Sequence, residues 1–307
     1  MPTPEPVPFT LITGFLGAGK TTYLNQLIRN GLPRDSLIVV NDFGDINIDA
    51  ELIEYRDEQI LSLGNGCICC TLGGTLAEQL AQAMRMEPRP AAIYIEASGV
   101  AEPARIADIA RTSRQLQLAS VICLVDGSQI NKHAADRYTA DVWRSQIAGA
   151  SQVLVNRLPP APAQALEILK SINPAAMLNA TGNSCEAGSL RQAPALTPVL
   201  RHTGSAWGSV SLSYRSAIDA QRLEQLLRDY GDVVLRAKGI LARKDLRQPQ
   251  VFQLSGGVPR WLPARRDPAA NQLVCIGIKG QRFDALACAL AQLESASATD
   301  APVACAI

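Results

Sequence analysis

Residues 14–21 read Gly-Phe-Leu-Gly-Ala-Gly-Lys-Thr, and the apolar run Phe-Thr-Leu-Ile-Thr at residues 9–13 comes directly before them. The glycines of this Gly-x-x-x-x-Gly-Lys-Thr pattern let successive backbone N–H groups point inward at the oxygens of a polyphosphate. The pattern needs a strand before it and a helix after it. Residues 9–13 have the character of a buried strand, and apolar residues recur at helical spacing over residues 23–28. The sequence therefore predicts a nucleotide-binding loop; the alternative is a glycine-rich turn that binds nothing.

Within this pattern the side chains have distinct expected roles. Lys20 would reach the β- and γ-phosphates, and the Thr21 hydroxyl would be a ligand of Mg²⁺. The positive N-terminal end of the following helix would face the same anion. The residues expected to contact the nucleotide are Gly14, Gly17, Ala18, Gly19, Lys20, Thr21 and Thr22.

A second unusual stretch is Gly-Asn-Gly-Cys-Ile-Cys-Cys at residues 64–70. Cys67 and Cys69 fall on one side of an extended chain, and a turn can bring Cys70 to them. The start of the chain has no signal-peptide pattern, so we expect the cytoplasm, where thiols stay reduced. Three thiolates suit a soft transition metal such as Zn²⁺ or Cu(I). The alternative is a buried turn rich in small residues.

Strand-like and helical patterns alternate along roughly the first 200 residues. Such alternation is typical of an α/β fold with a parallel sheet and flanking helices. The expected strands are 9–13, 37–41, 92–96, 121–126 and 153–156, and the expected helices are 76–84, 104–110 and 163–172. Because ligands bind beyond the carboxyl ends of parallel strands, the motifs at these ends are expected to form one site.

The composition changes at residues 192–205, which are rich in Pro, Ala and Thr and are expected to be a linker. The pattern beyond it predicts a smaller α+β domain with an antiparallel sheet. Its expected strands are 210–214, 233–241, 251–254, 260–262 and 273–278, and its expected helices are 220–229 and 283–293. We expect a nucleotide-binding domain over 1–200, the α+β domain over 205–294 and a disordered tail over 295–307.

These motifs together resemble the CobW-type GTP-dependent metallochaperone family. The matching segments are residues 13–22, 41–45, 64–70 and 95–103, followed by 234–239 and 273–277. The resemblance implies a P-loop NTPase fold and a slow GTPase that binds GTP, GDP and Mg²⁺. It further implies delivery of Zn²⁺, or of Co²⁺ or Ni²⁺, to a client metalloprotein.

The acidic residues at two strand ends have roles implied by the same resemblance. Asp42 and Asp45 lie where a switch loop would cover the γ-phosphate, with Asp42 near Mg²⁺ and Asp45 catalytic; their alternative is an acidic cap on a solvated turn. Glu96 ends a hydrophobic strand and would contact Mg²⁺ or orient the attacking water. Gly99 would let the next loop approach the γ-phosphate. Contacts of the γ-phosphate would hold the loops 42–45 and 67–70 in one arrangement, and their release on hydrolysis would change the geometry of the metal site.

One segment departs from the family pattern. The family carries Asn-Lys-x-Asp after a late strand, and its Asp recognises guanine, whereas residues 156–159 are Asn-Arg-Leu-Pro. Asn156 is retained as a nucleotide contact, but Pro159 stands in place of the carboxylate, and no Asp occurs in residues 142–218. An alternative function is therefore a metal-responsive regulatory switch with weak or absent hydrolysis and relaxed base specificity. A small-molecule kinase would leave the cysteines unexplained.

The overall composition argues against other classes of function. The 29 basic and 28 acidic residues give a net charge of +1, which leaves no basic surface for nucleic acid. No apolar run reaches the roughly 20 residues that cross a bilayer. A homo-oligomer is compatible with the sequence. Cys123, Cys275 and Cys288 lie in apolar runs and are expected in the core, and His202 could supply a fourth metal ligand.

Overall fold

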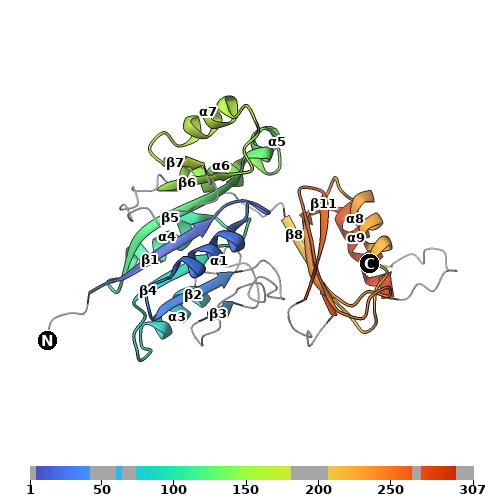
Figure 1. The fold of residues 1–307 in the computed structure, drawn as a ribbon, viewed down its shortest axis with the longest axis horizontal. Helices are drawn as coiled ribbons and strands as arrows, with labels where there is room; N and C mark the ends of the chain where they lie inside the picture. Colours follow the sequence, from blue (N-terminus) through green and yellow to red (C-terminus); the bar gives the residue numbers. More distant parts are fainter. Residues whose placement is uncertain (1–4, 42–59, 64–73, 181–206, 265–270, 295–307) are drawn as a thin grey trace. The chain divides into compact units, whose positions relative to one another are not determined.

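The computed structural model describes residues 5–41, 60–63, 74–180, 207–264 and 271–294. The described chain divides into two compact units, one with the residues up to Ala180 and one with those from Trp207 onward (Figure 1). Each unit is described by itself below. The predicted domain boundaries stay predictions, and the linker and the tail lie outside the described residues.

Seven described strands of the first unit form a parallel sheet in the order β3-β2-β4-β1-β5-β6-β7. The apolar runs of the central strands are buried on both faces, as expected for a parallel sheet, whereas the edge strand β7 is largely exposed. β1 lies at its centre, between β4 and β5, so the loop after β1 emerges in the middle of the sheet. The strands are β1 (Val7–Thr13), β2 (Ser36–Asn41), β3 (Ile60–Leu63), β4 (Ala92–Glu96), β5 (Leu116–Asp126), β6 (Gln152–Asn156) and β7 (Met177–Ala180).

Helices cover both faces of this sheet. Neighbouring residues of β1 point to opposite sides, so each face carries apolar side chains that pack against helices. Leu11 packs in a core with α3 and α4, and Ile12 packs in a second core with Leu24 of α1. The helices are α1 (Lys20–Asn30), α3 (Gly74–Ala83), α4 (Pro103–Thr112), α5 (Ile130–Ala135), α6 (Ala140–Ala148) and α7 (Ala163–Ile172), with a short 3-10 turn η1 (Gly127–Gln129).

The second unit is an antiparallel sheet in the order β11-β10-β9-β12-β8. Helices α8 and α9 lie side by side against one face (Figure 1), where Leu223 and Leu286 join a core with Phe252 and Leu273. Its elements are β8 (Trp207–Tyr214), α8 (Ala220–Asp229), β9 (Val234–Leu241), β10 (Gln250–Ser255), β11 (Val258–Pro263), β12 (Asn271–Ile278), α9 (Gln281–Ala291) and η2 (Gln292–Glu294).

The predicted fold class is confirmed in both units. The sequence patterns missed the two edge strands β3 and β7 and the helices α5 and α6, and they recognised only the second half of β5. Cys123 and Cys275 are buried as predicted, whereas Cys288 is partly exposed. No helix within the described ranges has both the length and the apolar character needed to span a bilayer.

Candidate nucleotide-binding site

The loop between β1 and α1 has a backbone that only glycine adopts easily. Gly14, Gly17 and Gly19 have φ values of 135°, 80° and 93°. A Cβ atom on Gly14 would lie 2.3 Å from the carbonyl oxygen of Leu124 in β5, which is far inside van der Waals contact. The glycines therefore allow both the left-handed turn and the close approach of the loop to the neighbouring strand.

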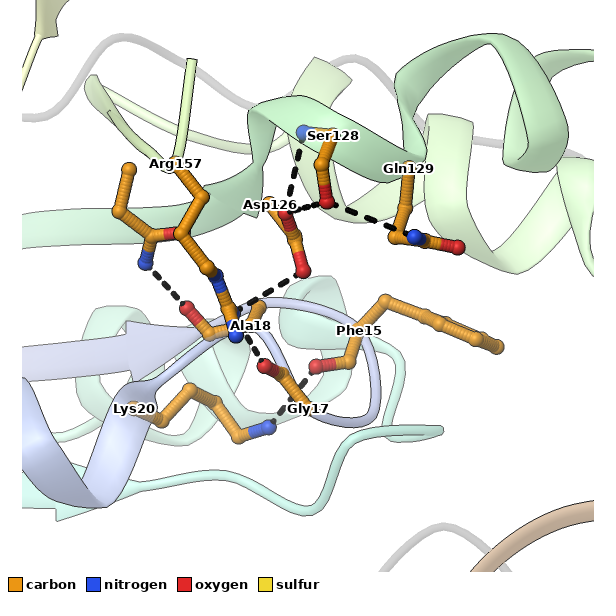
Figure 2. A network of polar contacts seen from close by, with 9 residues as sticks. Phe15, Gly17, Ala18, Lys20, Asp126, Ser128, Gln129 and Arg157 are labelled. Carbon is orange, nitrogen blue, oxygen red and sulfur yellow. Dashed lines mark hydrogen bonds and ion pairs between the residues drawn. The ribbon is translucent and has the colours of Figure 1, made fainter. Parts of the chain in front are cut away.

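Lys20 is the first residue of α1, and its side chain is 95% buried. Its ammonium group donates hydrogen bonds to the carbonyl oxygens of Gly14 at 2.9 Å and Phe15 at 3.3 Å. The Lys20 side chain thus folds back onto the loop, with its positive charge against the loop backbone (Figure 2). The first backbone N–H groups of α1 also lie at this end of the loop, and they have no acceptor within the helix. The arrangement fits an anion such as a polyphosphate.

Thr21 and Glu96 are brought together from neighbouring elements. Glu96 ends β4 beside β1 and is almost fully buried, and its Oε1 accepts a hydrogen bond from the Thr21 hydroxyl at 2.8 Å. The nearby hydroxyls of Thr13 and Ser98 are buried without a hydrogen-bond partner among the described residues. A carboxylate and a hydroxyl next to Lys20 are the hard oxygen ligands that suit Mg²⁺ bound together with phosphate.

Asn156 and Arg157, at the end of β6, hold the loop from its other side. The Asn156 amide donates to the carbonyl oxygen of Ala18 at 2.7 Å, and Arg157 Nη2 donates to that of Gly17 at 2.6 Å. Arg157 has a φ of 49° and forms an ion pair with Asp126 at 3.1 Å (Figure 2). The Arg that replaces the Lys of the family pattern therefore anchors the phosphate loop.

Asp126, the last residue of β5, caps the turn η1 and is part of this network. Its Oδ1 accepts hydrogen bonds from the Ser128 backbone at 3.0 Å and the Ser128 hydroxyl at 2.7 Å, while Oδ2 faces Arg157. Both carboxylate oxygens are therefore already engaged within the protein.

A cluster of three aromatic rings, which the sequence patterns did not predict, supports the loop between β1 and α1. The ring of Phe15 packs edge-on against His133 of α5 at 4.7 Å, and His133 lies 6.2 Å from Trp143 of α6. Burial lowers the pKa of His133, and the Lys132 ammonium lowers it further. A neutral imidazole suits this apolar contact. No spacing in the sequence could have revealed the contact of Phe15 with His133, because these two residues are more than 100 positions apart.

Of the other predicted site residues, some are described by the structure and some are not. Gly99 packs directly against Leu16 of the loop, and Thr22 is exposed on α1. The described ranges contain no group of three or more His, Cys, Asp or Glu side chains arranged to hold a metal ion. Six predicted residues lie outside the described residues: Asp42, Asp45, Cys67, Cys69, Cys70 and His202.

The parallel sheet, the glycine loop and the Lys20-Thr21-Glu96 group define the first unit as a P-loop NTPase fold. Residues 8–179 match the family described as CobW/HypB/UreG, nucleotide-binding domain. Residues 207–294 match the cobalamin synthesis protein CobW C-terminal domain. The chain belongs to this family, as the resemblance in its motifs predicted.

Individual relatives align with parts of the chain. It is 38% identical to the zinc chaperone CobW of a Sinorhizobium species over 103 residues, which cover 32% of this chain and 29% of that protein. It is 30% identical to the zinc-regulated GTPase metalloprotein activator 1 of Schizosaccharomyces pombe over 179 residues, which cover 55% and 43%. The alignments thus span less than half of these two relatives.

Among solved structures, the Zn(II)-bound YjiA GTPase of E. coli matches 94% of this chain and 99% of its own chain. The TM-score is 0.47 and the sequence identity is 20%.

Proposed function

We propose that this chain is a nucleoside triphosphatase, with GTP as its expected nucleotide, that couples nucleotide binding and slow hydrolysis to the transfer of a transition metal. The observation that carries the proposal is the group formed by Lys20 and Thr21 at the start of α1 and Glu96 at the end of β4, of which Lys20 and Glu96 are buried. It unites a phosphate-binding cation with two oxygen ligands for Mg²⁺. The relatives named zinc chaperones support zinc as the first candidate for the metal.

Lys20, Thr21 and Glu96 would have different roles in hydrolysis. Lys20 would hold the β- and γ-phosphates, and Thr21 and Glu96 would hold Mg²⁺, which neutralises developing negative charge on the phosphates when bound. Glu96 has a second expected role, the orientation of the attacking water. Asp45 in the switch loop would assist catalysis.

The metal is the cargo, held by Cys67, Cys69 and Cys70. Zn²⁺ is the expected ion, and Co²⁺ and Ni²⁺ are the alternatives. The partner would be a client metalloprotein in the cytoplasm, and a homo-oligomer is part of the same proposal. A second candidate, the regulatory switch with relaxed base specificity, is favoured by Pro159 in place of the guanine-binding carboxylate.

Hydrolysis distinguishes the two candidates, and base specificity tests the effect of the lost carboxylate in either of them. We expect GTP to bind less than about tenfold more tightly than ATP, because the lost carboxylate removes hydrogen bonds of roughly 1.5–3 kcal/mol each. The Asp126 carboxylate already holds Ser128 and Arg157. Calorimetry with both nucleotides, and a hydrolysis assay with Mg²⁺ with and without one equivalent of Zn²⁺, measure this directly.

Pro159→Asp is expected to raise the preference for GTP, and Pro160→Asp is the matched control because it adds the same charge one residue further on. A GTP preference above about a hundredfold in the unchanged protein would contradict the expectation, since it would require an intact charged acceptor. Binding of nucleotide without hydrolysis under any of these conditions would overturn the triphosphatase and leave the switch.

A further inference from the structure

Gln146 of α6 is a fully buried amide outside the nucleotide motifs. Its Nε2 donates hydrogen bonds to the carbonyl oxygens of Gly99 and Ala101, each at 3.1 Å. Both partners can only accept hydrogen bonds, so the NH₂ end of the amide must face them. The buried Oε1 then has no hydrogen-bond partner among the described residues. A leucine here would remove the unsatisfied Oε1 but would also take the amide donor away from two buried carbonyl oxygens, so the role of the amide is to hold those two carbonyl groups.

The two carbonyl groups belong to the segment that directly follows Glu96. The segment is tied to β1 by a hydrogen bond from the Ala97 N–H to the Ile12 carbonyl oxygen at 2.8 Å. A turn follows, in which the Ala101 N–H donates to the Ser98 carbonyl oxygen at 3.0 Å. Residues 97–101 therefore link the candidate Mg²⁺ ligand to α4.

This segment also touches the phosphate loop. A Cβ atom on Gly99 would lie 2.4 Å from Leu16 Cδ2, so Gly99 packs closely against that loop. In a trans peptide the C=O and the following N–H point in opposite directions. Because Gln146 fixes the carbonyl group of Gly99, it also fixes the N–H of Val100 pointing away from α6. One amide thus sets the direction of a backbone donor beside the phosphate loop.

We propose that Gln146 is a positioning residue of the triphosphatase that fixes the segment 97–101 in the arrangement that binds the terminal phosphate. The inference rests on the proposed function and deepens it. The loop and the start of α1 would hold the α- and β-phosphates, with Lys20 reaching on to the γ-phosphate, whereas this segment extends from Glu96. Gln146 should therefore matter for a nucleoside triphosphate and hardly at all for a diphosphate.

The test compares Gln146→Leu with Asn173→Leu, a matched control in which the amide directly after α7 also bonds to backbone carbonyl groups, those at the carboxyl end of α6. The Asn173 amide donates to the carbonyl oxygens of Ile147 at 2.8 Å and Ala150 at 2.9 Å and does not contact the segment. Removing two hydrogen bonds in Gln146→Leu is expected to lower kcat and the affinity for a non-hydrolysable GTP analogue by about tenfold each. GDP affinity should stay within about twofold of the unchanged protein. Asn173→Leu is expected to lower the Tm and leave all three values unchanged.

Equal losses for GDP and the analogue, or analogue affinity that is unchanged in folded Gln146→Leu, would overturn the inference. Gln146→Glu gives a second test if the leucine variant does not fold. A buried carboxyl group stays protonated more readily and can then donate one hydrogen bond, so analogue affinity in this variant should rise as the pH falls. A pH-independent affinity equal to that of the unchanged protein would contradict the proposal. If the unchanged protein hydrolyses no nucleotide, the triphosphatase proposal fails, while the two affinities still test Gln146.

Discussion

Replacing Lys20 by Ala is expected to weaken binding of Mg²⁺-bound GTP by about a thousandfold and to abolish hydrolysis, because contacts to two phosphates contribute roughly 1.5–3 kcal/mol each. The ammonium group is buried and already directed over the loop, so binding needs only the exchange of its hydrogen bonds to Gly14 and Phe15 for phosphate oxygens. Calorimetric titration measures the affinity, and phosphate release measures hydrolysis.

Lys170→Ala is the control for the loss of one positive charge. Lys170 is exposed on α7 and is 3.5 Å from Glu167, so its removal should change neither measurement. GTP affinity within about threefold of the unchanged protein in Lys20→Ala would mean that the loop does not hold the nucleotide as proposed, because lost charged contacts cost more than that.

Replacing Cys67, Cys69 and Cys70 together by Ala is expected to lower zinc affinity by at least about a thousandfold, because thiolates provide most of the binding at a soft-metal site. These cysteines lie outside the described residues, and their role is implied by the sequence motif. Competition with a chromophoric chelator measures the affinity, and nucleotide affinity without metal should stay the same.

Cys275→Ala is the matched control for the cysteine variant. Cys275 is fully buried in the core of the second unit, and this burial raises the pKa of its thiol to about 12. Its replacement should leave zinc affinity unchanged. If the triple variant binds zinc as tightly as the unchanged protein, the metal site lies elsewhere in the chain.

The sequence predicted the fold where local pattern and burial agree. The strands β1, β2, β4 and β6 are continuous apolar runs, and each was predicted to within two residues. The edge strands β3 and β7 were missed because they are four residues long and carry too little pattern. Helix α5 has six residues, which is less than two turns of periodicity.

The site was predictable only where function requires a residue type at a fixed place along the chain. Lys20 and Thr21 follow from the loop motif, and Glu96 follows from its place at a strand end. The contacts of Gln146 with Gly99 and of His133 with Phe15 join residues that are distant in sequence and follow no periodicity. Such contacts are created by the tertiary fold, and a single sequence carries no signal for them.

The central claim is that the state of the nucleotide controls the metal site. The most direct test is the zinc affinity of the full chain, measured by chelator competition with Mg²⁺ and either GDP or a non-hydrolysable GTP analogue. Coupling of typical size predicts a difference of about tenfold between the two states, and zinc must then change the relative affinities of the two nucleotides by the same factor. Zinc affinities that agree within about twofold would contradict the account, because two uncoupled sites cannot transfer metal in response to hydrolysis.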